Sequence, residues 1–188
     1  KEKNLHEIYL KKAKTLSLAC RKASSKLASR VEKELRKLAM EKCRFNIEVC
    51  SREAGPLGID SVEFNLSSNI GEDPLPINRI ASGGELSRLA LALKSISNVD
   101  VYSKSLIFDE IDAGIGGRTA SAVASKLVSV SRGHQVLCVT HIPQIAACAD
   151  LHFRVSKVPV KGRTEVRILK LEREERKVEL ARMLAGDQ

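Results

Sequence analysis

The sequence predicts an α/β fold with parallel strands flanked by helices, preceded by one long helix. Two short apolar segments, at 105–109 and 135–140, have the length and composition of buried strands. The segment between them, 117–131, has the periodicity of an amphipathic helix. Alternating strands and helices are typical of an α/β layer in which the strands run parallel.

The first 42 residues predict a single long helix. No Pro or Gly interrupts this segment, and apolar or small residues recur at steps of three or four, which is a helical stripe. The stripe consists of Leu5, Tyr9, Ala13, Leu16, Cys20, Ala23, Leu27, Val31, Leu35 and Leu38. A stripe of this length favours pairing with another helix, as in an antiparallel coiled coil. We therefore divide the chain into a helix at 1–42 and a globular part at 43–188.

The positive charge of the chain is concentrated in that helix. The whole chain has a formal net charge of +9, and residues 1–42 contain 13 basic and 5 acidic side chains. Two interpretations stay open for this basic surface. It is either a solvated helix face, whose charges could pair with an acidic partner helix, or a contact with a polyanion such as the DNA backbone. The candidate DNA contacts are Lys22, Lys26 and Arg30.

The remaining segments predict a mixture of strands and helices. The positions of turn residues and the alternation of apolar and polar residues indicate the secondary structure of each segment. Strands are expected at 45–49, 59–66, 151–156 and 165–171, a turn at 55–58, a loop at 67–78, and helices at about 84–97, 143–148 and 172–184.

Several classes of protein are excluded by composition. No apolar run approaches the roughly 20 residues that span a bilayer, and no signal-peptide pattern is present, so no membrane partner is expected. The five cysteines include no C-x-x-C pair, which predicts buried, reduced thiols in a cytoplasmic protein. With no Trp and 3% aromatic residues, the chain lacks the composition of a stacking platform for single-stranded nucleic acid.

The first segment with a chemical signal is the one around Ser82. Ser82 and Glu85 form a capping-box pattern, in which the Ser hydroxyl caps a helix and the Glu side chain reaches back. That pattern alone is structural. Gly83 and Gly84 add a second property, because they let a ligand approach bare backbone N–H groups at a helix N-terminus, which is an anion site.

Two further segments place polar side chains at the ends of predicted strands. Asp109 and Glu110 follow the first apolar strand, where ligands bind in open α/β sheets. This has the form of a Walker B element, in which one acid holds Mg²⁺ and the next orients an attacking water. His141 follows the second apolar strand; taken alone, it is more often a histidine satisfied at a strand end. A Gly-rich turn at 111–117 lies directly after the acid pair.

Together these segments resemble the second half of an ATP-binding-cassette (ABC) ATPase head. Longer stretches, namely ASGGELSRLALALKSI, IFDEIDAGIGG and THIPQIAACADLHFRVSK, resemble the RecN family of bacterial DNA-repair proteins, relatives of the SMC proteins. The resemblance runs from about residue 45 to 184, and the basic helix matches the coiled coil that re-enters the head. Ser82–Glu85 then corresponds to the signature motif, Asp109 and Glu110 to the Walker B pair, Asp112 to the D-loop and His141 to the switch histidine.

The resemblance implies a composite site for ATP and Mg²⁺ between two heads. In one head, Asp109 would hold Mg²⁺ through water, Glu110 would polarise the attacking water and His141 would contact the γ-phosphate. Ser82, Gly83 and Gly84, with Glu85 in the same motif, would serve the nucleotide of the opposite head. Asp112 would help to align the two active sites across the dimer.

One motif of such a site does not occur in the 188 residues. The phosphate-binding loop G-x-x-x-x-G-K-[ST] is absent. In RecN-like proteins it lies in the other half of the head, so the expected partners are that N-terminal half, a second copy of the head, and DNA. The chain is therefore expected to be the C-terminal part of a larger, nucleoid-associated protein.

The implied function is that of an ATPase in DNA double-strand-break repair and recombination. Two alternatives remain. One is a DNA-binding or scaffolding module with a degenerate ATPase site, which the intact Asp109, Glu110, Ser82 and His141 disfavour. The other is the head of a transporter or of another SMC-type protein. Transporter ATPases usually carry Gln where Glu85 stands, and they lack a long coiled coil.

Overall fold

The computed structural model describes residues 2–69, 71–80, 82–97, 105–160 and 163–186. The chain forms two compact units, Lys1–Val99 and Asp100–Gln188, each considered by itself below. The boundary expected after residue 42 stays a prediction. Among the described residues, no helix is long and apolar enough to cross a membrane.

The first unit begins with the long helix α1 (Glu2–Lys37). This helix is about one turn shorter than predicted, because Ala39 adopts a left-handed conformation with φ of 59°. The backbone N–H of Met40 donates to the Leu35 carbonyl at 3.0 Å, which closes the helix end in the manner of a Schellman motif. Leu38 and Met40 then turn into the core.

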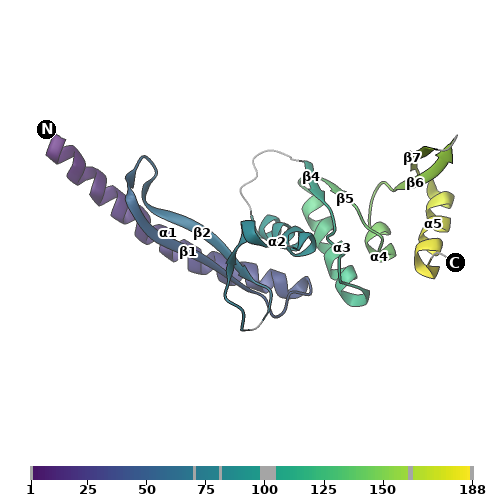
Figure 1. The fold of residues 1–188 in the computed structure, drawn as a ribbon, viewed down its shortest axis with the longest axis horizontal. Coiled ribbons are helices and arrows are strands. Elements are labelled where there is room, and N and C mark those ends of the chain that lie inside the picture. Colours follow the sequence, from purple (N-terminus) through teal and green to yellow (C-terminus); the bar gives the residue numbers. More distant parts are fainter. Residues whose placement is uncertain (1, 70, 81, 98–104, 161–162, 187–188) are drawn as a thin grey trace. The chain divides into compact units, whose positions relative to one another are not determined.

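Two long strands pack along this helix. β1 (Arg44–Gly55) and β2 (Gly58–Ser67) form an antiparallel hairpin, which lies beside α1 over much of its length (Figure 1). β1 continues to Gly55, well beyond the predicted strand end at residue 49. It can do so because the hairpin turn needs only two residues between Gly55 and Gly58. Gly58 has φ of 107°, a conformation that favours glycine. Near the tip, the Tyr9 hydroxyl donates to the Gly55 carbonyl at 2.8 Å.

The apolar stripe of α1 is thus covered in part by a β-hairpin, where sequence reasoning anticipated only another helix. Ala13, Val31 and Leu35 are buried. Leu5 and Leu16, nearer the start of the helix, remain exposed. The described residues therefore leave part of the stripe open for the predicted coiled-coil partner.

The rest of the first unit leads to a second helix. The segment expected to be loop contains the short strand β3 (Leu75–Pro76), which pairs with β2, and the 3₁₀ turn η1 (Ile77–Arg79). Helix α2 (Gly83–Ile96) follows, within one residue of its predicted ends, and buries Leu89, Leu91 and Ala92. Packing of these apolar side chains fixes α2 as part of the unit's core.

The second unit contains the predicted parallel pair. β4 (Ser105–Phe108) and β5 (Gln135–Cys138) pair in parallel, and α3 (Gly117–Ser131) connects them. The helix has the predicted bounds, and its apolar face buries Val123 and Leu127. Both strands end one or two residues earlier than predicted, β4 before Asp109 and β5 before Val139. This is the parallel sheet of the predicted α/β fold.

One face of this two-stranded sheet is apolar and open. Ile107 is 72% exposed, and Leu137 and Val139 are also largely exposed. They alternate with the side chains that face α3, as the period of a strand requires. Within the described residues, nothing covers this face.

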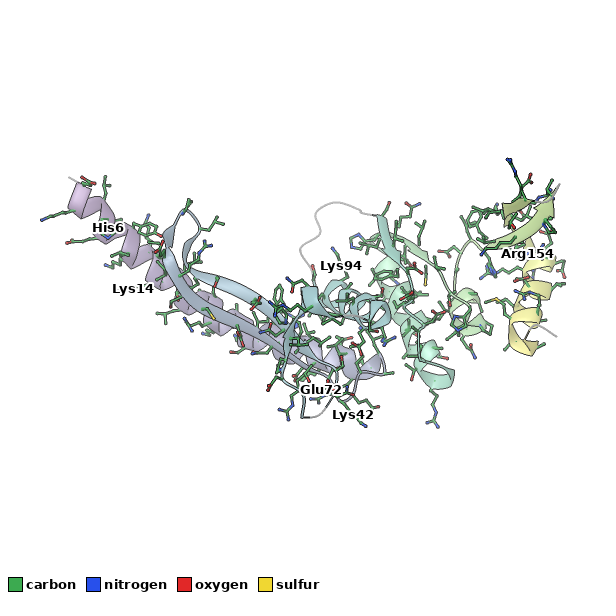
Figure 2. The ribbon with its side chains drawn as sticks, in the orientation of Figure 1. His6, Lys14, Lys42, Glu72, Lys94 and Arg154 are labelled. Carbon is green, nitrogen blue, oxygen red and sulfur yellow. The ribbon has the colours of Figure 1, made fainter. Side chains whose placement is uncertain are left out.

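The chain ends in an antiparallel hairpin and a helix. α4 (Pro143–Ala146) leads into β6 (Phe153–Val160) and β7 (Arg163–Lys170), which pair antiparallel, and α5 (Arg173–Ala185) closes the unit. Arg154 projects from β6, and its Nη1 lies 3.6 Å from Oε2 of Glu179 in α5 (Figure 2). The parallel arrangement predicted for the middle of the chain therefore does not extend to these last strands.

The cysteines depart in part from the prediction of buried thiols. All five are free, as expected. Cys43 is buried and two others are half-buried, but Cys50 and Cys148 are exposed. Cys50 lies on a hairpin strand and Cys148 follows α4, where sequence pattern alone did not reveal the exposure.

Candidate functional site

The acid pair lies directly after β4. Phe108 is buried at the end of the strand, whereas Asp109 and Glu110 are exposed. The Glu110 backbone N–H donates to the Asp109 carboxylate at 2.9 Å. Glu110 has φ of 54°, which is uncommon for a residue with a side chain and costs about 1–2 kcal/mol. Such strain is typical of functional turns, and here it presents the two carboxylates at the carboxyl end of the sheet.

Asp112 and His141 meet at the same end of the sheet. Because β4 and β5 are parallel, their carboxyl ends are neighbours, and the Val139 N–H extends the ladder to the Phe108 carbonyl at 3.0 Å. Asp112 is buried, and its Oδ2 accepts a hydrogen bond from the His141 backbone N–H at 2.9 Å. The same oxygen lies 3.1 Å from His141 Nδ1. The acid turn and the histidine loop are thus tied together.

Thr140 completes this connection and was missed by sequence reasoning. Its hydroxyl donates to Asp112 Oδ2 at 2.5 Å and accepts from the Ile142 N–H at 3.0 Å. Thr140 and Asp112 are 28 residues apart in the chain. The signal that could have found it is its place directly before His141, at the end of a strand that neighbours the acid turn.

Cys138 lies at the end of β5, close to these carboxylates. Burial, together with the negative charges of Asp112 and Asp109, raises the pKa of its thiol to about 11. The thiol is therefore neutral at physiological pH, when a nucleophilic cysteine would be a thiolate.

The signature segment lies in the first unit, at the start of α2. Ser82 is the N-cap, and its hydroxyl accepts from the Glu85 N–H at 3.4 Å. Gly83 and Gly84 occupy the first two helical positions, whose N–H groups have no partner within a helix. Gly84 is buried, and the anion site at this helix start stays a prediction.

The Glu85 side chain makes a contact that differs from the predicted one. The capping box expected it to reach back toward Ser82, but its Oε2 accepts from the Ser68 hydroxyl at 2.6 Å. Ser68 follows β2, so Glu85 ties the start of α2 to the end of the hairpin. A two-way capping box occurs instead in α5, between Glu172 and Glu175.

A buried arginine belongs to the helix that begins with the signature segment. Arg88 lies one turn after Glu85 and is 7% exposed. Burial lowers the pKa of its guanidinium, while the nearby negative charge of Glu85 opposes that effect. Burial also raises the pKa of Cys43 to about 11. Sequence reasoning singled out neither residue, and the signal for Arg88 was a charge on the apolar side of a helix.

Two of the three candidate DNA contacts on the basic helix differ from the third in their surroundings. Lys22, Lys26 and Arg30 are all exposed on α1. The Arg30 guanidinium, however, donates to the Ile96 carbonyl at the last turn of α2, at 3.2 Å. Figure 2 shows side chains along the length of α1, among them the labelled Lys14. Lys22 and Lys26 are therefore better placed than Arg30 for contact with an anion.

The predicted site residues fall into two groups. Asp109, Glu110, Asp112 and His141 come together in the second unit, and Ser82 with Glu85 belongs to the first. Among the described residues, no three His, Cys, Asp or Glu side chains gather closely enough to hold a metal ion by themselves. Mg²⁺ bound with a nucleotide needs only one or two carboxylates, since phosphates and water supply its other ligands. The exposed acid pair after β4 fits that requirement.

Comparisons with known proteins agree on one family, although no family model matches the chain. The DNA repair protein RecN of Vibrio cholerae is 42% identical over 186 residues, which cover 98% of this chain and 34% of that protein. RecN of Bacillus subtilis is 44% identical over 179 residues, covering 87% of this chain and 31% of that protein. The chain thus spans about a third of the length of the curated relatives it matches.

Solved structures show the same fold in more distant proteins. The Smc head domain of Pyrococcus yayanosii, with its coiled coil and joint, matches 82% of this chain and 28% of its own, with a TM-score of 0.55 and 23% identity. A structure of an SMC ATPase, described in terms of ATP-driven dimerisation and DNA-stimulated activation, matches 92% of this chain and 99% of its own, with a TM-score of 0.53 and 15% identity. At these identities the match concerns the fold. With the RecN relatives, it shows that the chain belongs to the RecN family and has the fold of part of an SMC head domain.

Proposed function

We propose that this chain is the C-terminal part of an SMC-like ATPase that acts in DNA repair. The observation that carries the proposal is the meeting of the acid pair and the histidine loop at the carboxyl ends of β4 and β5. The RecN relatives are named as DNA repair proteins, which supports the same assignment. The active site would be completed by the N-terminal half of the same protein and by a second copy of the head.

The residues after β4 and β5 would act on the terminal phosphate of ATP. Bound Mg²⁺ would neutralise charge on the phosphates. Asp109 would hold the ion through water, and the Glu110 carboxylate would accept a hydrogen bond from the attacking water and so orient it. His141, whose side chain is 79% exposed, is accessible for contact with the γ-phosphate.

The start of α2 would serve the nucleotide held by the opposite head. The Ser82 hydroxyl accepts from the Glu85 N–H, so its own hydrogen stays available to donate to a phosphate oxygen. The N–H groups of Gly83 and Gly84 point out of the helix start, where the helix dipole favours an anion. Binding of ATP would thereby draw the two heads together.

The open face of the β4–β5 sheet supports a role for the N-terminal half. Ile107, Leu137 and Val139 form an apolar surface on a sheet that has two strands among the described residues, whereas sheets most often have about four to six. Further polypeptide of the same protein, which would carry the phosphate-binding loop, is the occupant that this face fits. This chain alone would then bind no ATP.

DNA is the second proposed partner. The observation that favours it is the concentration of positive charge on α1, with Lys22 and Lys26 exposed. A basic helix face attracts the phosphate backbone without regard to sequence. The protein would then work in the cytoplasm, on the nucleoid.

The decisive test replaces Glu110 by Gln in the full-length protein. The amide cannot act as the water-orienting base, so we expect turnover to fall by roughly 10²-fold or more, with ATP affinity within about twofold of the unchanged protein. Steady-state phosphate release and equilibrium binding of a fluorescent ATP analogue measure the two quantities. Asp150→Asn, at an exposed carboxyl elsewhere in the second unit, is the matched control.

Full hydrolysis by the Glu110→Gln protein would remove Glu110 from the mechanism. A full-length protein that binds DNA but hydrolyses no ATP, even before substitution, would favour the scaffolding alternative. Either result would overturn the proposed ATPase site.

A further inference from the structure

Asp112 makes contacts that its motif does not predict. Its carboxylate is buried, and a single oxygen, Oδ2, accepts hydrogen bonds from the Thr140 hydroxyl and the His141 backbone N–H and lies 3.1 Å from Nδ1 of the His141 ring. All three groups belong to the loop after β5. The buried acid is therefore occupied within its own head, by the residues that present the switch histidine.

These contacts define the orientation of the imidazole. An ionised carboxylate only accepts hydrogen bonds, so its proximity favours a hydrogen on the His141 nitrogen that faces Asp112. That nitrogen is Nδ1, at 3.1 Å, and Nε2 is consequently the nitrogen on the outer side of the ring. Without this anchor, an imidazole that is 79% exposed would sample several rotamers, and the position of Nε2 would be lost.

Thr140 extends the anchor to the next helix. Its hydroxyl donates to Asp112 and accepts from the N–H of Ile142, the N-cap residue of α4. One short chain of hydrogen bonds therefore runs from the acid turn through the histidine loop to α4. Both ends of the His141 backbone are fixed by it.

We propose that Asp112 and Thr140 are positioning residues that act through His141 of the same head. They hold the ring so that Nε2 faces the γ-phosphate, and they set which ring nitrogen carries the hydrogen. This inference rests on the proposed ATPase function. It assigns Asp112 a role inside one head, which is distinct from alignment of two active sites across a dimer.

A double-mutant cycle in the full-length protein tests this role. We expect His141→Ala to lower kcat by about 100-fold and Asp112→Ala by roughly tenfold or more, because the ring loses its anchor. The double variant should be no slower than His141→Ala alone, because Asp112 has nothing left to position. ATP affinity should change by less than about threefold in all three, which separates positioning from binding.

Thr140 offers a matched pair of variants that leaves the acid in place. Thr140→Ser keeps the hydroxyl and should retain most of the turnover. Thr140→Val has nearly the same shape without the hydroxyl and should lower kcat with little change in ATP affinity. Thermal unfolding of each variant reports whether the loop and the head remain folded.

The outcomes separate the inference from the function on which it rests. Multiplicative losses for Asp112→Ala and His141→Ala, or equal turnover of the Ser and Val variants, would overturn the positioning role and leave the ATPase site standing. Full turnover by His141→Ala would instead remove His141 from the proposed mechanism. Asp112→Ala could instead abolish ATP-dependent head dimerisation while His141→Ala still lowers kcat by its full factor in the Asp112→Ala background. That result would assign Asp112 to the dimer interface and overturn the positioning role.

Discussion

Glu179 shows how this chain keeps a carboxylate in a buried position. It lies on α5 with its side chain 6% exposed, and Arg182 and Arg154 surround it. The hydrogen bonds from Arg182 lower the pKa of Glu179, and the charge of Arg154 adds to them, against the opposing effect of burial. The carboxylate therefore stabilises the fold when it is ionised.

We expect Glu179→Gln to lower the free energy of unfolding by about 2 kcal/mol at pH 7, as for a hydrogen bond to a charged group. Because the pKa of Glu179 is lower in the folded than in the unfolded state, its contribution is present above the unfolded value. It is lost as the pH falls through the folded value. Urea unfolding at pH 7 and at successively lower pH measures both effects. Glu174→Gln, at an exposed site of the same helix, should change stability by less than about 0.5 kcal/mol.

The sequence predicts candidate site residues where polar or ionisable side chains directly follow a predicted strand. Asp109, Glu110 and His141 follow apolar segments in the sequence, so the pattern predicted their place at strand ends, whereas their roles come from the resemblance and stay predictions. The contact of Thr140 with Asp112 spans 28 residues, and it depends on which strands are neighbours. The contact of Glu85 with Ser68 overrode a local capping pattern, because the end of the hairpin lies within reach.

At the scale of the elements, the backbone conformation at the end of α1 is unfavourable for the residue that adopts it. Ala39 holds a left-handed conformation that suits glycine, and it closes the helix there because Leu38 and Met40 gain burial. The packing of these two side chains outweighs the backbone cost at Ala39, which is about 1 kcal/mol.

We expect Ala39→Gly to raise the free energy of unfolding by about 1 kcal/mol, because glycine adopts this conformation without strain. The same substitution at Ala23, an exposed interior position of α1, should lower it by about 1 kcal/mol. Denaturant unfolding of the two variants compares them directly. A loss of stability in both would contradict the left-handed closure of the helix.

Element types were easier to predict than their partners. The helix 117–131 has the predicted bounds, since its apolar period is unbroken and glycines precede it. The first helix was predicted one turn too long, because its stripe continues through Leu38 after the backbone has left the helix. The hairpin partner of α1 could not be foreseen, because periodicity reports that a face is covered and not by what.

For the whole molecule, charge is divided very unevenly along the chain. Nearly all of the excess positive charge lies in residues 1–42, and the remaining 146 residues are close to neutral. An attraction for DNA would therefore be localised on α1, and it would weaken steeply as salt rises.

We expect Lys22→Glu with Lys26→Glu to weaken DNA binding by the full-length protein at least tenfold at low salt, and to flatten its salt dependence. Fluorescence anisotropy with a labelled duplex, measured across a salt series, gives both quantities. Glu substitutions at Lys157 and Lys170 in the C-terminal hairpin provide a control of equal charge. Unchanged binding by the α1 variant would favour a solvated surface or an acidic partner helix.

The open sheet of the second unit also has a practical consequence. Among the described residues this sheet has two strands, and it offers other molecules the apolar side chains of Ile107, Leu137 and Val139 beside strand edges that no described strand pairs with. Prepared without the rest of its polypeptide, the chain should therefore self-associate as its concentration rises. Co-expression with the proposed N-terminal half should keep the chain monodisperse. Its solubility would therefore report whether that half covers the apolar face of the sheet.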